Sequence, residues 1–183
     1  EQGLIFSGGD MTLRTTSLTN LLGDIYSLGG LDVARDELGG NLDLLDNRSA
    51  SIESTKDMTL RAAVLRNRKD VFDWSLVQTY GQVVLHCGDC GGDHHNVDYE
   101  AIERFEASVQ ADSAASRIHS GENLIVKGGE IANQYSTLSA VKDISVVATS
   151  LENTGANLVS VERVRLFNTG RVTDGTEERF TGR

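Results

Sequence analysis

The 183-residue chain contains no proline and only two cysteines, and aromatic residues make up 5% of it. Proline cannot donate to the hydrogen-bond ladder of a sheet, so its absence suits long, uninterrupted strands. No apolar run approaches the roughly 18 residues that a membrane-spanning helix requires. We therefore expect no membrane insertion by this segment.

Positive charge is also scarce, since 17 Lys and Arg residues face 27 Asp and Glu residues and the net charge is −10. Binding to phosphates needs clustered Lys and Arg, and no such cluster occurs, which argues against nucleic acid as the main partner. A surplus of acidic residues is common on exported proteins, so we infer no metal and no other cofactor from it. The chain begins at Glu1 inside a repeat and shows no signal peptide, which suggests a piece of a longer array.

What the chain does have is an internal repeat. The template consists of an apolar residue, a free position, Ser or Ala, two free positions, Asp or Asn, then apolar, free, apolar, and after four more positions apolar, free, Asn. Its copies begin at Ile5, Ile25, Ile52, Ile118, Leu138 and Leu158. Three of the five steps are 20 residues, and the other two, of 27 and 66 residues, are the same step with an insertion. Such a period indicates a coil whose loops can lengthen without loss of register.

A unit of about 20 residues is too short for the two helices of a helical repeat and suits short strands. In Leu124-x-Val126 and Ile144-x-Val146 the two apolar side chains lie on one face of a strand. Strands of this kind can stack on their own next copy, about 4.8 Å further along. We therefore predict an all-β chain that forms a right-handed parallel β-helix of about six rungs with a 20-residue repeat.

The predicted domains follow from the register of the repeat. We expect β-helix rungs over residues 1–67 and 118–172, an extra-helical insertion over 68–117 and a polar tail over 173–183. The insertion contains half of the ten aromatic residues and is strand-rich: Val71 to Leu85 reads as one or two strands with a turn near Gly81. Tyr99 to Ala111 has a pattern that fits either a helix or a strand, and we favour a strand.

An asparagine closes most copies of the repeat, where the chain has to turn. Asn tolerates left-handed backbone angles, and its amide can bond to neighbouring backbone groups. We expect these side chains to form a ladder at one corner of the coil. They are Asn20, Asn47, Asn67, Asn133 and Asn153.

The insertion also holds the chain's two cysteines, Cys87 and Cys90, flanked by His86, His94 and His95. Three interpretations compete. A disulfide that closes a glycine-rich loop suits a secreted protein with an even number of cysteines, and we favour it. A zinc site built from both thiolates and two of the histidines is a second interpretation. A thioredoxin-type redox site is the third, but members of that fold carry a cis-proline, and this chain has no proline.

With the repeat written out, the chain resembles the haemagglutinin repeats of filamentous haemagglutinin and of CdiA-type contact-dependent growth-inhibition exoproteins. The match lies in Asp57-Met-Thr-Leu60 with its closing Leu65-x-Asn67, and in Asn20 followed by Ile25-x-Ser27. It covers roughly residues 5–67 and 118–166. The insertion is similar to excursions that some of these exoproteins carry.

The resemblance implies a β-helical stalk that is secreted and displayed on the surface of a Gram-negative bacterium. It implies an outer-membrane two-partner-secretion transporter as partner of the parent protein, and adhesion through a target-cell receptor or delivery of a toxin as its role. No catalytic residue carries over, so we expect a structural segment that is not an enzyme. A rival hypothesis is a β-helical carbohydrate-active enzyme that uses the recurring Asp10, Asp57, Asn123 and Asp143, but recurrence at one phase of a repeat is also what a turn residue shows.

Overall fold

The computed structural model describes residues 3–89 and 96–169. Within these residues it contains strands and no helix, and the chain divides into two compact units. Unit 1 comprises residues 1–72 and 111–156, and unit 2 comprises residues 73–110 and 157–183. Among the described residues there is no helix long and apolar enough to cross a membrane.

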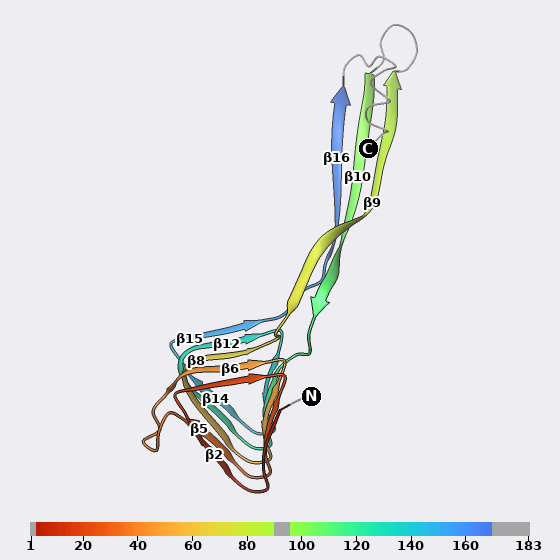
Figure 1. Ribbon diagram of the computed structural model, residues 1–183. Coiled ribbons are helices and arrows are strands. Elements are labelled where there is room, and N and C mark those ends of the chain that lie inside the picture. Colours follow the sequence, from red (N-terminus) through yellow and green to blue (C-terminus); the bar gives the residue numbers. More distant parts are fainter. Residues whose placement is uncertain (1–2, 90–95, 170–183) are drawn as a thin grey trace. The chain divides into compact units, whose positions relative to one another are not determined.

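Unit 1 is a parallel β-helix, which confirms the predicted fold class (Figure 1). The chain passes through five turns of the coil. They are made by β1 (Leu4–Ser7), β2 (Met11–Arg14) and β3 (Ser17–Leu21); β4 (Asp24–Ser27), β5 (Leu31–Ala34) and β6 (Leu42–Arg48); β7 (Ser51–Ser54) and β8 (Met58–Arg68); β11 (Arg117–Ser120) and β12 (Leu124–Gln134); and β13 (Thr137–Ala140), β14 (Ile144–Val147) and β15 (Ser150–Thr154).

The strands of successive turns pair in parallel and in register with the repeat. Ile52 of β7 lies between Ile25 of β4 and Ile118 of β11. Val126 of β12 lies between Leu60 of β8 and Val146 of β14. Equivalent positions of the template therefore stack on one another, which is what a fixed repeat demands of a coil.

The apolar positions of the template point into the coil and form one continuous core. Its buried members are Met11, Ile25, Leu31, Val33, Leu42, Leu45, Ile52, Met58, Leu60, Ala62, Leu65, Ile118, Leu124, Val126 and Ile131. Leu13 and Val146 pack against this core but are only partly buried, because they lie in the first and last turns, where a neighbour on one side is missing.

Two glycines allow successive turns to approach closely at one point of the coil. A Cβ atom on Gly128 would lie 1.9 Å from the carbonyl oxygen of Ala62, and one on Gly129 would lie 2.7 Å from that of Ala63. Because the obstructing atoms belong to the backbone of the neighbouring turn, no side-chain rotation could relieve either contact. These positions require glycine for space, at ordinary negative φ angles.

The sheet of unit 2 has the order β16-β10-β9 and is made by β9 (Phe72–Asp89), β10 (Asn96–Asp112) and β16 (Ser160–Thr169). The first residue of β9 and the last two residues of β10 belong to unit 1. The strand-rich insertion is thus confirmed, and the segment around Tyr99 to Ala111 is a strand as expected. The predicted turn near Gly81 is wrong, because β9 runs through this residue without interruption.

The predicted sixth rung is also wrong. Instead of stacking on β13, the copy of the repeat that begins at Leu158 forms β16, which pairs antiparallel with β10 through Ile102 opposite Val164 and Phe105 opposite Val161. The alternating apolar residues of β16 fit either a parallel or an antiparallel sheet, so the pattern alone does not decide its partner. In the structure this partner is β10. The unit boundary also differs from the predicted one, since residues 68–72 and 111–117 belong to the coil. The predicted tail over 173–183 lies outside the described residues.

Candidate functional site

The five repeat asparagines form a single column that runs through all five turns of the coil. Each amide nitrogen donates to the amide oxygen of the next asparagine, over 3.0, 2.9, 2.8 and 2.8 Å in the order Asn20, Asn47, Asn67, Asn133 and Asn153. Asn47 and Asn67 have no solvent exposure. Such a chain of buried amides is stable only when every member is hydrogen-bonded, since an unpaired buried amide is costly.

Each of the four donating asparagines also ties down the backbone of a corner. The amide nitrogen of Asn67 donates to the carbonyl oxygen of Thr137 at 2.9 Å, and that of Asn47 donates to the carbonyl oxygen of Ala50 at 2.9 Å. Asn133 makes the equivalent bond to Ser136 at 2.9 Å. The column thus fixes both the spacing of the turns and the path of the chain after them.

The asparagines do not adopt the left-handed backbone angles that the sequence suggested. Three of them lie two residues before the residue that does: Leu22, Ser49 and Tyr135 have φ angles of 53°, 46° and 53°. The N–H groups of these three residues still donate to the next turn, to Arg48, Arg68 and Thr154. The chain bends at this residue without breaking the ladder, and the asparagine acts through its side chain instead.

A second column, to which the sequence analysis assigned no role, is made by the serines of the template. Ser27, Ser54 and Ser120 are buried. The hydroxyl of Ser120 lies 2.7 and 2.8 Å from the carbonyl oxygens of Lys56 and Asn123, which share its single O–H, and it accepts from the N–H of Glu122 at 3.3 Å. The hydroxyl of Ser27 serves the same corner two turns earlier, where it lies 2.7 and 2.9 Å from the carbonyl oxygens of Gly9 and Gly30. The fixed place of Ser in the repeat was the signal that could have revealed this column.

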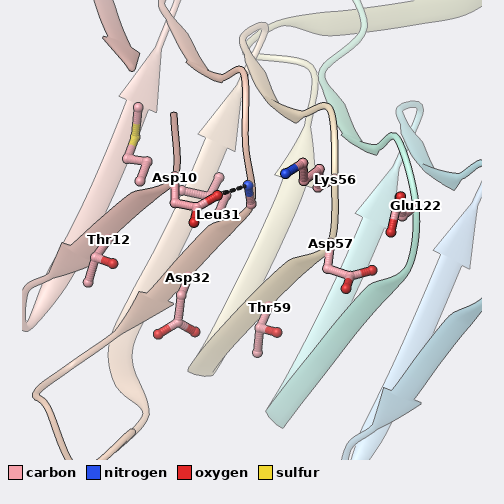
Figure 2. A pocket seen from close by; sticks show the side chains of 10 residues that line it. Asp10, Thr12, Leu31, Asp32, Lys56, Asp57, Thr59 and Glu122 are labelled. Atoms are coloured by element: carbon pink, nitrogen blue, oxygen red, sulfur yellow. Dashed lines mark hydrogen bonds between the residues drawn. The ribbon is translucent and has the colours of Figure 1, made fainter. Parts of the chain in front are cut away.

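The recurring Asp and Asn residues form a third column, on the outside of the coil. Asp10 accepts from the N–H of Gly30 at 2.8 Å, as Figure 2 shows, and Asp57 accepts from the N–H and the side-chain amide of Asn123 at 3.0 and 2.8 Å. Asn123 in turn accepts from the N–H of Asp143 at 3.3 Å. These residues link successive turns, as turn residues would.

The same face carries an open pocket of about 480 Å³, lined in part by Asp10, Asp32, Asp57, Lys56 and Glu122 (Figure 2). Two of its carboxyl groups, those of Asp32 and Asp57, are poorly suited to acid–base catalysis, which requires a pKa near the working pH. Hydrogen bonds from Asn123 lower the pKa of Asp57. Burial alone would raise the pKa of Asp32, but hydrogen bonds from Arg61 and Arg14, together with their positive charges, lower it below its usual value.

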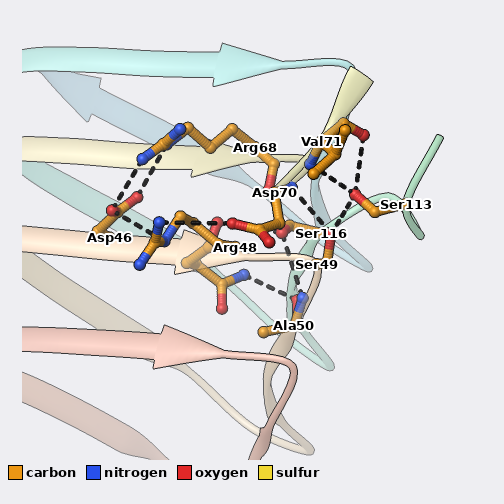
Figure 3. Close-up of polar contacts among 10 residues, drawn as sticks. Asp46, Arg48, Ser49, Ala50, Arg68, Asp70, Val71, Ser113 and Ser116 are labelled. Atoms are coloured by element: carbon orange, nitrogen blue, oxygen red, sulfur yellow. Dashed lines mark hydrogen bonds and ion pairs between the residues drawn. The ribbon is translucent and has the colours of Figure 1, made fainter. Parts of the chain in front are cut away.

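A polar cluster holds the point where the chain leaves the coil after β8 and returns to it before β11 (Figure 3). The guanidinium group of Arg68 donates to both carboxylate oxygens of Asp46, at 3.1 Å each, and Asp46 is 6% exposed. The hydroxyl of Ser116 is buried and lies 3.0 and 2.6 Å from the carbonyl oxygens of Asn47 and Arg68, which share its single O–H. Because this anchor belongs to the coil, the insertion begins later and ends earlier than the repeat alone suggested.

The hydroxyl of Ser113 adds hydrogen bonds in the same region. It pairs with the hydroxyl of Ser49 at 2.7 Å and accepts from the N–H of Val71 at 2.9 Å. Lys69, near the start of the insertion, forms an ion pair with Asp112, near its end. Its ammonium group also lies 4.8 Å from the centre of the Phe72 ring. These contacts are hydrogen bonds, an ion pair and a cation–π contact. They do not place a nucleophile beside a base, so they indicate a structural role.

The predicted disulfide cannot be placed on the structure. Cys90 lies outside the described residues, as do His94 and His95, and only the backbone of Cys87 and His86 is described. The disulfide therefore stays a prediction. In the part of the chain that the structure describes, no three His, Cys, Asp or Glu side chains are grouped so that they could hold a metal ion.

Comparison with known proteins agrees with the repeat geometry. The family described as "Haemagglutinin repeat" matches residues 1–45, 38–73 and 96–173. The chain belongs to this haemagglutinin-repeat family. The predicted resemblance is thereby confirmed. In this member of the family, the repeated Asn, Ser and Asp positions form the three columns described above.

Two relatives carry CdiA names. A protein named "Deoxyribonuclease CdiA" from Dickeya dadantii (strain 3937) is 30% identical over 109 residues, which cover 56% of this chain and 3% of that protein. A protein named "Toxin CdiA" from Escherichia coli is 25% identical over 185 aligned positions, which cover 83% of this chain and 6% of that protein. This haemagglutinin-repeat chain thus spans only a few per cent of either relative. No solved structure matches it significantly.

Proposed function

We propose that this haemagglutinin-repeat chain is a non-catalytic spacer segment in the stalk of a secreted, surface-displayed exoprotein of a Gram-negative bacterium. The observation that supports this most directly is the asparagine column. It links five successive turns through amides of which four are buried, while the outward carboxylates link turns or pair with arginines. A spacer needs this kind of rung-to-rung continuity, and it does not need a convergent site.

The CdiA names of the two relatives favour toxin delivery over adhesion as the role of the parent protein. The chain matches 3% and 6% of the lengths of these relatives, so any toxic activity of the parent would lie elsewhere in the protein. The partners that follow from this proposal are an outer-membrane two-partner-secretion transporter, which would export the parent, and a receptor on the target cell.

The proposal can be tested in the full parent exoprotein with one inward and one outward variant. Asn67→Asp disrupts the buried column, and we expect it to reduce surface display of the parent and therefore its contact-dependent activity. The double variant Asp32→Asn, Thr59→Ala changes outward side chains beside the pocket of Figure 2 and should leave both unchanged. Normal display with lost activity in the outward variant would show that this face binds a ligand, and would contradict a pure spacer role.

A further inference from the structure

Strand β9 has an unpaired edge. It lies at one end of the order β16-β10-β9, and no strand among the described residues pairs with its other side. An exposed edge presents a row of free N–H and C=O groups, and monomeric proteins usually protect it with charges, proline or a bulge. From Trp74 to Leu85, β9 contains no Asp, Glu, Lys, Arg or Pro.

From Trp74 to Val83, the residues of this stretch are exposed on both faces of the sheet. Trp74, Leu76 and Tyr80 on one face are 39%, 45% and 41% exposed. Val77 and Val83 on the other face are 42% and 37% exposed. A strand with an open edge and two exposed apolar faces is the type that accepts a further strand.

The opposite edge of the sheet, β16, is different. Arg165 of β16 pairs with Glu103 of β10 at 2.5 Å, and Glu162 pairs with Arg104 at 2.9 Å. The guanidinium group of Arg163 lies 5.3 Å from the centre of a ring on β10. Charged side chains thus recur along β16, which is the usual protection of an edge. Only β9 lacks it.

The sequence of β9 identifies its partner, because it is nearly the same when it is written backwards from Tyr80. Residues Leu76 to Val84 read Leu-Val-Gln-Thr-Tyr-Gly-Gln-Val-Val. Two antiparallel copies centred on Tyr80 would place Val77 opposite Val83, Gln78 opposite Gln82 and Leu76 opposite Val84. Matched cross-strand pairs of this kind stabilise antiparallel sheets.

We propose that β9 pairs in antiparallel fashion with β9 of a second copy of this chain. The two-fold axis passes midway between the two Tyr80 residues, which lie opposite each other. The axis stands perpendicular to the sheet, so each side chain keeps its face and every contact is made twice, as a two-fold interface requires. The two three-stranded sheets join into one sheet of order β16-β10-β9-β9-β10-β16. The nine paired residues extend over about 31 Å.

Charge variants at Gln78 and Gln82 test both the pairing and its register. Both residues are exposed, and in the proposed register Gln78 of one copy faces Gln82 of the other. In the variant Gln78→Lys, Gln82→Lys, two lysines oppose each other at both ends of the pair, so the dimer should dissociate. In the matched variant Gln78→Lys, Gln82→Glu, lysine faces glutamate, and the dimer should persist.

Sedimentation equilibrium of the whole chain provides the measurement. We expect a dimer mass for the wild type and for the Lys/Glu variant, and half that mass for the Lys/Lys variant. The proposal is overturned if the wild type is a monomer at every concentration, as it would be if another segment of the same chain covered β9. It is also overturned if the two charge variants have the same mass.

A cysteine on the two-fold axis gives an independent readout. In a background with Cys87→Ser and Cys90→Ser, Tyr80→Cys should form a disulfide between two copies under mild oxidation, because directly opposed Cβ atoms lie within about 5.5 Å. Ser75→Cys is the control, since it is exposed on the same strand but does not face itself. Equal cross-linking of both variants would contradict the register.

Discussion

Replacing Asn67 with Asp would probe the asparagine column at its most enclosed point. Asn67 is fully buried, and its amide nitrogen donates to Asn133 at 2.8 Å and to the carbonyl oxygen of Thr137 at 2.9 Å. Its amide oxygen accepts from Asn47 at 2.9 Å. Aspartate has nearly the same shape but, when ionised, no donor. The variant therefore keeps the packing and removes two hydrogen bonds.

The expected loss of stability is large. Two hydrogen bonds contribute about 1 kcal/mol each, and a buried carboxylate without a partner charge costs about 3 kcal/mol or more. We therefore expect the free energy of unfolding to fall by about 5 kcal/mol at neutral pH, which approaches the whole stability of a marginal domain. Urea denaturation followed by far-UV circular dichroism would measure this change.

The pH dependence of the variant tests the cause. Burial raises the pKa of an unpaired carboxyl group in the folded state above its unfolded value of about 3.9. The variant should consequently approach wild-type stability below about pH 4, where the carboxyl group is protonated in both states, and lose stability as the pH rises through the higher folded pKa. A constant difference from pH 3 to 7 would mean that charge is not the cause.

Asn153→Asp is the matched control. Asn153 ends the described column and is exposed, and it only accepts from Asn133, at 2.8 Å. An aspartate can still accept this bond, so the control should lose less than about 1 kcal/mol. Equal losses in Asn67→Asp and Asn153→Asp would refute the argument that the column is stabilised by buried donors.

Three further predictions concern other parts of the chain. Gly128→Ala should lower the free energy of unfolding by about 2 kcal/mol or more in urea melts because of the contact with the neighbouring backbone, whereas Gly8→Ala, which has open space, should have little effect; similar losses would contradict the close approach. Asp32 has a lowered pKa, so its ion pairs stabilise the fold above about pH 4 and are lost as the pH falls through the folded pKa; the stability difference between wild type and Asp32→Asn should stay under about 1 kcal/mol and vanish in acid, and a difference that grows in acid would reverse the assignment. Protein prepared without reductant should show no free thiol at Cys87 or Cys90 after denaturation, and stoichiometric zinc by elemental analysis would overturn the disulfide.

The template that begins at Ile5 and closes at Asn20 carries most of the information about the coil. Its apolar positions identify the core, and its fixed phase stacks Ile25, Ile52 and Ile118 in register, because a coil can repeat only if equivalent residues meet. Nothing in this pattern reports which neighbour a strand will choose. The last copy, at Leu158, therefore looked like a rung although it pairs with β10.

Two local features were hidden for different reasons. The turn angle is adopted by Leu22, Ser49 and Tyr135, three unrelated side chains, so no residue preference marks that position. The cluster around Asp46, Arg68 and Ser116 joins residues that are 22 and 48 positions apart, and single-sequence periodicity does not reveal such long-range pairs. In contrast, Ser27, Ser54 and Ser120 occupy a constant phase of the repeat. That constant phase alone could have predicted that their hydroxyl groups bond to the backbone of a corner.

The direction of the hydrogen bonds in the asparagine column has a consequence for how the coil is assembled. Every amide nitrogen from Asn20 to Asn133 donates towards the C-terminal side, so a completed turn offers a donor and the following turn supplies the acceptor. A turn that docks one residue out of register would present a different side chain to that donor and leave it unpaired. The column therefore has a direction, and a misaligned turn would cost the unpaired donor of the turn before it. This cost favours the correct register between successive turns.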